Sequence, residues 1–197
     1  MFTTRPEIRG TFGAVATTHW LASAVGMSVL ERGGNAFDAA VAAGFVLQIV
    51  EPHLNGPGGE VPIILKRTDA PEPVVICGQG PFPMAATPER FAELGLRQVP
   101  GTGLLPSVVP GAFDAWMLLL RDHGTWSPRA VLEAAIGYAE DGFPVLPRVS
   151  ASILPAREFF LRNGPARPRF GCPAAKCRAR GLASAPGHRR HVPPHLG

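Results

Sequence analysis

The fold is decided by the run GGNAFDAAVAAGFVLQIV at residues 33–50. Asn35 is a helix-capping residue type, and Asp38 follows three residues later as in a capping box, so a helix is predicted over Ala36–Val50. This helix is apolar on almost every side, and at about 15 residues it is too short to cross a bilayer. We therefore predict a buried central helix with alanines that allow a sheet to approach closely, namely Ala39, Ala40, Ala42 and Ala43.

The chain before this helix is predicted to hold a short strand and another helix. Gly13–Thr17 is a brief apolar and β-branched run, which favours a strand. Thr17 and Thr18 then offer side chains that cap a helix beginning near His19. Apolar residues recur at helical spacing as far as Gly33-Gly34, where glycine permits the left-handed backbone of a helix end.

The chain after the central helix alternates between turns, strands and helices. Pro52 ends the helix, and residues 51–59, EPHLNGPGG, contain little that fits one. Two strand-like runs, Val61–Lys66 and Pro73–Cys77, flank a turn and predict a hairpin. Later helices are predicted to begin at Thr87-Pro88, near Gly111, at Ser127-Pro128 and after Pro147, with Gly124 and Gly142 ending the second and third and Pro155 kinking or restarting the last. The pattern is that of a mixed α/β protein.

The composition excludes several classes of protein. The chain has 197 residues, 46% of them apolar and 17% charged, which suits one ordinary domain. No uninterrupted apolar run approaches the length of a membrane helix, about 20 residues, and residues 1–13 lack the apolar core of a secretory signal. Three cysteines do not make a disulfide scaffold in a chain of this length. We expect a cytoplasmic protein with no membrane partner.

The charge is unevenly divided, and the division predicts two regions. Residues 164–197 hold six arginines, Lys176 and no acidic residue, or +7, whereas residues 1–163 hold 12 basic and 15 acidic residues, or −3. The basic tail is also rich in proline and glycine. It cannot bury enough apolar surface to offset the entropy of ordering, so we expect a globular part at 1–163 and a disordered tail at 164–197. Nonspecific attraction of the tail to nucleic acid is the less favoured interpretation.

The common catalytic signatures are missing. The sequence has no Gly-x-Ser-x-Gly elbow, phosphate-binding loop, His-Glu-x-x-His or complete Gly-x-Gly-x-x-Gly, and its short glycine loops are interpreted as tight turns. Glu51 beside His53 fits an oriented general base, but a loop histidine more often has a structural role. Cys77 ends an apolar strand and is expected to be buried.

Cysteines and histidines in the tail raise the question of a zinc site. Their spacing is Cys172-x4-Cys177-x10-His188-x2-His191. A zinc finger needs about 12 residues between the two pairs and at least about 3 between the histidines, so both spacings are too short. We predict no metal site.

Several blocks of the chain resemble the N-terminal signature of the gamma-glutamyltransferase (gamma-glutamyltranspeptidase) family. The first runs from Ala22 to Ala42 and continues through Val50–His53 and Gly56–Gly59. Further blocks follow in the family's order, at Ala86–Phe91, Val109–Phe113 and Tyr138–Val145. Because separate blocks agree in order, the resemblance is specific, and it covers about residues 10–163.

The resemblance implies an N-terminal-nucleophile hydrolase, whose fold is a four-layer αββα sandwich, here partial and incomplete. Family members cleave themselves into a large and a small subunit, and the small subunit begins with the catalytic threonine. The threonine hydroxyl attacks a gamma-glutamyl amide while its own amine acts as the base, and water or an acceptor amine resolves the acyl-enzyme. The resemblance therefore implies a gamma-glutamyl small-molecule substrate, a small subunit as partner and no cofactor.

The chain departs from the family pattern in its threonines. None matches the nucleophile, because Thr17, Thr18 and Thr102 lie in the wrong part of the pattern. The similarity stops near Asn163, where the composition turns basic, and we hypothesise a shifted reading frame for the tail. We expect a gamma-glutamyltransferase-like chain that ends before the catalytic threonine, holds no catalytic residue and is inactive alone.

A second departure concerns Gln79. Aligning Val75–Gly80 through Pro83 and Thr87 puts Gln79 where classical members have an arginine that grips the substrate's α-carboxylate. Glutamine offers a neutral amide in place of a charged bidentate fork, a loss of about 1–3 kcal/mol. The flanking Gly78 and Gly80 are expected to give a ligand access. Gln79 is therefore the predicted substrate-binding residue.

Two other functions stay open at this point. One is a noncatalytic subunit that pairs with a separately encoded small subunit, and the other is a nucleic-acid binder that acts through its basic tail. In the family fold both subunits share the central sheets. Open sheet edges and apolar faces are therefore expected to make the isolated chain poorly soluble.

Overall fold

The computed structural model describes residues 7, 9–101, 103–156 and 182–183. Its helices are α1 (Trp20–Glu31), α2 (Ala36–Val50), α3 (Pro88–Glu93), α4 (Ala112–His123), α5 (Pro128–Asp141) and α6 (Pro147–Ile153), followed by the 3-10 turn η1 (Leu154–Ala156). Its strands are β1 (Val61–Leu65), β2 (Val74–Gly78), β3 (Phe143–Pro144) and β4 (Leu182–Ala183). No helix within these described ranges has the length and apolar character needed to cross a membrane.

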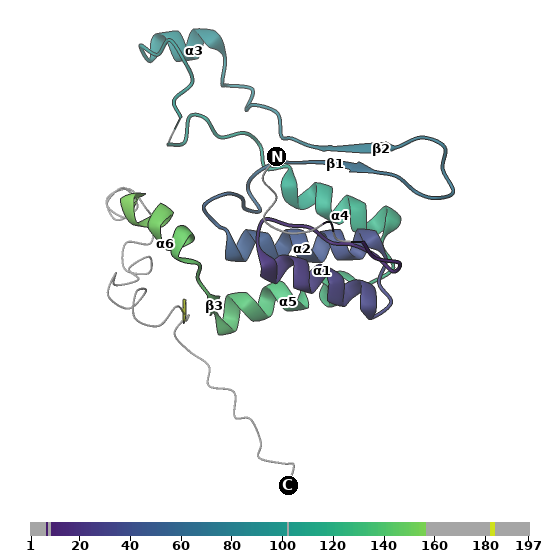
Figure 1. Cartoon of the computed structure of the whole chain (residues 1–197). Coiled ribbons are helices and arrows are strands. Elements are labelled where there is room, and N and C mark those ends of the chain that lie inside the picture. Colours follow the sequence, from purple (N-terminus) through teal and green to yellow (C-terminus); the bar gives the residue numbers. More distant parts are fainter. Residues whose placement is uncertain (1–6, 8, 102, 157–181, 184–197) are drawn as a thin grey trace.

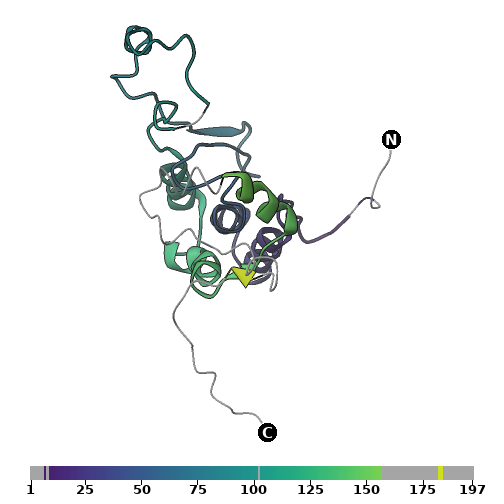
Figure 2. The ribbon, with the colours of Figure 1, turned by 90° about the vertical axis from the view of Figure 1, so that its left-hand side faces the viewer.

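Helix α2 is the centre of the fold, as predicted. Figures 1 and 2 show α1, α4 and α5 around it, and the β1–β2 hairpin lies over α4. The predicted capping box is present, because Asn35 Oδ1 accepts the N–H of Asp38 at 2.9 Å and Asp38 Oδ2 accepts the N–H of Asn35 at 2.9 Å. The fully buried side chains of α2 then supply much of the core, including Val41, Val46 and Val50.

Two of the small residues of α2 allow helix α1 to approach closely. A Cβ atom placed on Gly26 of α1 would lie 3.5 Å from both the carbonyl oxygen of Ala39 and the Cβ of Ala43. Ala39 and Ala43 thus lie against α1, and the predicted approach of a sheet to the four alanines stays a prediction. The hairpin packs chiefly on α4 instead, because its inward side chains join the core cluster that contains Leu119.

The β1–β2 hairpin is confirmed and has one packed and one open face. Its antiparallel register pairs Ile63 with Ile76 and Ile64 with Val75. Ile63 and Ile76 pack against the core cluster around Leu119. Ile64 and Val75 point away from the body and are 77% and 64% exposed. The hairpin therefore presents an apolar outer face.

Most predicted helix starts are confirmed by their caps, and the first is corrected. The hydroxyls of Thr87 and Ser127 cap α3 and α5. Helix α1, however, is capped by His19, whose Nδ1 accepts the N–H of Leu21 at 3.2 Å. Later in the chain, Pro155 lies in the 3-10 turn η1 directly after α6, which agrees with the prediction that this proline kinks or restarts the last helix.

The segment before α1 differs from its prediction. Residues 13–17 form no strand, since in the described structure they have no paired neighbour. Thr17 and Thr18 do not cap α1, because the Thr17 hydroxyl donates to the carbonyl of His19 at 2.7 Å and that of Thr18 donates to Glu51.

The fold class is mixed α/β, as predicted, and partial. The described residues contain two two-stranded sheets, β1–β2 and β3–β4, together with the helices. In the second sheet Phe143 pairs with Ala183 and Pro144 with Leu182. The strand β4 is the one described part of residues 164–197, so the division at 163/164 and the disorder of the tail stay predictions.

Between β2 and α4 the chain makes a long excursion, residues 81–109, which contains α3. Figure 1 shows the excursion extending away from the helical body. Its two ends meet, because the N–H of Val109 donates to the carbonyl of Pro81 at 2.9 Å. Large apolar side chains of the excursion are exposed, namely Phe82, Met84, Leu94, Val99, Leu104, Leu105 and Val109.

Candidate functional site

Gln79 is the first residue after β2, where the chain leaves the hairpin for the excursion. Its side chain is exposed, and its Oε1 accepts a weak hydrogen bond from the thiol of Cys77 at 3.9 Å. The expectation that Cys77 is buried is wrong. Cys77 is exposed and pairs with Pro62, because alternate residues of a strand face opposite sides and the apolar run does not reveal which side faces the core.

Backbone segments from separate parts of the chain converge beside Gln79. We call Gly59, Gly78, Gly80, Val109 and Gly111 the glycine neck. A Cβ atom on Gly80 would lie 1.5 Å from the carbonyl oxygen of Val109, and one on Gly111 would lie 2.6 Å from that of Gly78. The N–H of Gly111 donates to the carbonyl of Gly59 at 3.3 Å. Only residues without a side chain permit such close approach.

The glycine neck corrects one sequence interpretation and supports another. Gly78 and Gly80 were expected to give a ligand access to Gln79, but the space that a side chain would take at either glycine is filled by neighbouring backbone. The turn interpretation of the first glycine loop is confirmed, because the N–H of Gly59 donates to the carbonyl of Gly56 at 3.0 Å. The glycine neck thus joins three stretches that are distant in sequence, residues 56–59, 78–80 and 109–111.

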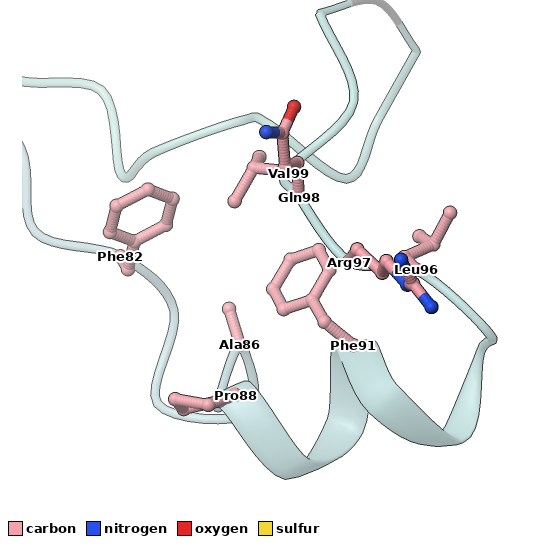
Figure 3. A pocket seen from close by; sticks show the side chains of 8 residues that line it. All are labelled: Phe82, Ala86, Pro88, Phe91, Leu96, Arg97, Gln98 and Val99. Atoms are coloured by element: carbon pink, nitrogen blue, oxygen red, sulfur yellow. The ribbon is translucent and has the colours of Figure 1, made fainter.

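A shallow pocket of about 320 Å³ lies in the excursion, a few residues beyond Gln79. In Figure 3, Phe82 and Phe91 line it from opposite sides with Ala86 between them, while the guanidinium of Arg97 is directed away from its centre. The pocket is therefore apolar where a ligand would rest. Gln79 is not among its lining residues, so the predicted substrate-binding residue lies outside this pocket.

A buried carboxylate lies at the end of α2. Glu51 is fully buried, its Oε2 accepts the hydroxyl of Thr18, and its Oε1 has no partner among the described residues. The Glu51 carboxylate makes no hydrogen bond to His53, whose Nδ1 is likewise buried without a described partner. The alternative of Glu51 orienting His53 as a general base is therefore wrong for this structure, and Glu51 instead links α2 to the segment before α1.

A second buried carboxylate, Asp38, anchors the loop between α4 and α5. It accepts the Thr125 hydroxyl at 2.6 Å and the backbone N–H groups of Thr125 and Trp126 at 2.9 and 3.1 Å. Burial raises the pKa of Asp38, but the hydrogen bonds from Thr125, Asn35 and Trp126 outweigh it and hold the pKa below its ordinary value. The capping role of Asp38 is predictable from the sequence, but its contact with this loop is not, because no local pattern signals a partner so distant in the chain.

The remaining candidate residues give no further site. Among the described residues, no group of three or more His, Cys, Asp or Glu side chains could hold a metal ion. The tail residues considered for zinc, and Thr102, lie outside the described residues. The Thr17 hydroxyl is engaged with the carbonyl of His19 and with Ser23 Oγ at 2.7 Å each.

Comparison with known proteins agrees with the resemblance seen in the sequence. The family model described as gamma-glutamyltranspeptidase matches residues 22–177, a range that ends beyond Asn163. The chain is 37% identical over 140 residues to a glutathione hydrolase-like YwrD proenzyme of Bacillus subtilis, covering 71% of this chain and 26% of that protein.

Solved structures share the fold as well as the sequence. LmbA2991HD superposes with a TM-score of 0.78 and 59% identity, over 81% of this chain and 27% of that one. The gamma-glutamyltranspeptidase of Helicobacter pylori superposes with a TM-score of 0.76 and 32% identity, over 84% of this chain and 48% of that one. The chain thus spans about a quarter of the length of the curated relative and of LmbA.

Proposed function

Because the chain belongs to the gamma-glutamyltranspeptidase family, we propose that it is the N-terminal part of an enzyme that hydrolyses or transfers a gamma-glutamyl or related acyl group. The observation that carries this proposal is the family match over residues 22–177, which includes all three stretches joined at the glycine neck. The names of relatives, glutathione hydrolase-like proenzyme and gamma-glutamyltranspeptidase, support the substrate class. The proposed chemistry is nucleophilic attack by the threonine with which the small subunit of this family begins.

In this proposal the chain supplies a scaffold and one wall of the substrate site. Gln79 is exposed at the end of β2, and the glycine neck fixes the backbone on both sides of it. Its amide donates a neutral hydrogen bond to the substrate carboxylate, where an arginine would add charge and a second parallel bond. We therefore propose weak selection for free α-carboxylates such as that of glutathione.

The partner in this proposal is a chain that carries the small subunit. The family relatives include a proenzyme, which is consistent with an enzyme of two subunits made from one precursor. A second chain that begins with the nucleophilic threonine would complete the site beside Gln79. A complex without turnover would correspond to a noncatalytic subunit.

Turnover of gamma-glutamyl-p-nitroanilide tests the proposal. The 197-residue chain is assayed alone and with a separately expressed chain that comprises the part of LmbA after the matched region. We expect nitroaniline release from the mixture and none from either chain alone. Release by the pure 197-residue chain would contradict the absence of a nucleophile, and an assembled but inactive mixture would contradict the proposed reaction.

The role of Gln79 is tested in the same mixture. Gln79→Arg is expected to lower the KM for glutathione by about tenfold, because a charge-assisted contact contributes about 1–3 kcal/mol. Gln98→Arg is the matched control, since it adds the same charge at an exposed glutamine within the excursion. Equal effects of the two variants would show that charge alone, and not the position of residue 79, changes glutathione use.

A further inference from the structure

The cap of α1 is a side chain that can change its charge. His19 Nδ1 accepts the N–H of Leu21 at 3.2 Å, and the residue is only 1% exposed. The other side-chain caps among the described helices are the oxygens of Asn35, Thr87 and Ser127. Those oxygens keep their charge at ordinary pH, whereas histidine commonly gains a proton between about pH 5 and pH 8. Helix α1 therefore begins at a titratable cap.

The capping hydrogen bond fixes where the imidazole of His19 carries its hydrogen. A ring nitrogen that accepts a hydrogen bond is not protonated, so Nδ1 is bare and the neutral ring holds its hydrogen on Nε2. Nε2 is also buried and has no partner among the described residues. Both nitrogens are thus enclosed by the fold, and the cap requires the neutral form of the ring.

A second proton on the ring turns the capping contact from favourable to unfavourable. An imidazolium is a hydrogen-bond donor at both nitrogens, so its Nδ1–H would face the N–H of Leu21 with no acceptor between them. The first turn of α1 then loses the acceptor that its free N–H groups need. Because His19 is buried, water can replace that acceptor only if the turn opens.

Titratable groups on neighbouring elements surround the start of α1. Glu51, at the end of α2, is fully buried and accepts the hydroxyl of Thr18, the residue before His19. His53 lies in the loop that follows, and Tyr138 of α5 packs against the buried cluster that contains the first turn of α1. An ionised carboxylate favours an imidazolium and burial disfavours one, so these surroundings set the pH of protonation. They do not change which nitrogen of His19 receives the proton.

We propose that His19 is a proton-operated cap, which holds the first turn of α1 while its ring is neutral and releases the turn when Nδ1 is protonated. The Thr17 hydroxyl donates to the carbonyl of His19, and the Thr18 hydroxyl donates to Glu51. Release of the turn therefore also loosens residues 17–18 from α1 and α2. The cap contributes stability at high pH and loses it as the pH falls, because the uncapped ring binds the extra proton. This device does not depend on the proposed reaction.

Nitrogen NMR of the 197-residue chain tests the protonation state directly. At about pH 8 we expect the ring signals of His19 to show a bare Nδ1 and a hydrogen on Nε2. A hydrogen on Nδ1 at this pH would overturn the proposal, because such a ring cannot accept the N–H of Leu21. This measurement needs no substitution, so it decides the point whether or not a variant folds.

Amide hydrogen exchange tests the release. Between about pH 8 and pH 5 we expect the protection factor of the Leu21 amide to fall at least about fivefold, the effect of losing an N-cap. The Phe37 amide is the internal reference, because it donates to Asn35 Oδ1 at 2.8 Å in the same position of α2. Its protection should stay constant. An unchanged protection of Leu21, or an equal fall at Phe37, would overturn the proposal.

His19→Asn is the decisive variant. Asparagine keeps a capping oxygen and does not titrate, so the protection of Leu21 should no longer depend on pH. His53→Asn is the matched control, because it removes the other histidine near the end of α2 and should leave the fall at Leu21 in place. A fall that persists in His19→Asn would overturn the proposal. A fall that disappears in His53→Asn would overturn it as well, because the proton would then act at His53.

Discussion

The hydroxyl of Thr125 donates to the carboxylate of Asp38 at 2.6 Å and joins the first turn of α2 to the loop between α4 and α5. The same carboxylate is the second half of the capping box at Asn35. Asp38 is therefore bound at once to the start of the central helix and to a loop 87 residues later in the chain. One buried side chain sets the relative position of three helices.

Asp38→Asn is expected to lower the free energy of unfolding at pH 7 by about 2–4 kcal/mol, because the neutral amide cannot accept the same set of N–H and O–H donors. The folded pKa of Asp38 lies below its ordinary value, so this contribution is present above the unfolded pKa, about 3.9, and is lost as the pH falls through the folded pKa. Urea unfolding at pH 7 and pH 3 measures both effects.

Two outcomes would contradict this role of Asp38. Glu72→Gln, which neutralises an exposed carboxylate, should leave the unfolding free energy unchanged within about 0.5 kcal/mol. If it costs as much as Asp38→Asn, the loss reflects net charge. If the Asp38→Asn difference is as large at pH 3 as at pH 7, the carboxylate form is not the source of the stability.

Thr18→Val is expected to destabilise the chain by about 2–4 kcal/mol, because it removes the one described donor to the fully buried Glu51 carboxylate. Thr18→Ser keeps a hydroxyl and should recover most of the loss. Thermal unfolding followed by circular dichroism compares the two variants. Similar melting temperatures for valine and serine would show that the hydrogen bond to Glu51 adds nothing to stability.

Gly80→Ala is expected to open the glycine neck, because the added methyl group would lie 1.5 Å from the carbonyl oxygen of Val109. Overpacking of this kind lowers stability by about 1–3 kcal/mol. Here it would weaken the contact that holds the two ends of the excursion together. Limited proteolysis should cut residues 81–109 faster in this variant. Gly56→Ala is the control, since a Cβ atom at Gly56 meets no atom within 4 Å; equal proteolysis of the two would refute the packing role of Gly80.

Helices were predictable from sequence because their signals are local. The Asn35 and Asp38 pair, the prolines at the starts of helices and the glycines at their ends all act within one turn of the residue concerned. The hairpin was also predictable, because two apolar runs that flank a turn are a local signal. The stretches of sequence that resemble the gamma-glutamyltransferase family indicated the correct family, because several separate stretches occur in the family's order.

The errors concern partners that are distant in sequence. Gly13–Thr17 has the composition of a strand, but a strand forms only when another backbone pairs with it, and no local pattern supplies one. The side of β2 on which Cys77 lies depends on which strand face meets α4. Contact between Gly80 and Val109 was likewise hidden, so the flanking glycines of Gln79 were misread as access for a ligand. The role of Gln79 itself stays a prediction.

The outer face of the hairpin gives the last prediction. Ile64 and Val75 form a cross-strand pair on that face and are 77% and 64% exposed, so they add little to the core and offer an apolar surface to other chains. Ile64→Lys should therefore reduce self-association, seen as a lower scattering mass at equal concentration, and change the unfolding free energy by less than about 1 kcal/mol. Ile63→Lys puts the same charge on the packed face, against the core cluster, and should unfold the chain. If Ile64→Lys aggregates as strongly as the parent chain, this face is not the surface through which the chain associates.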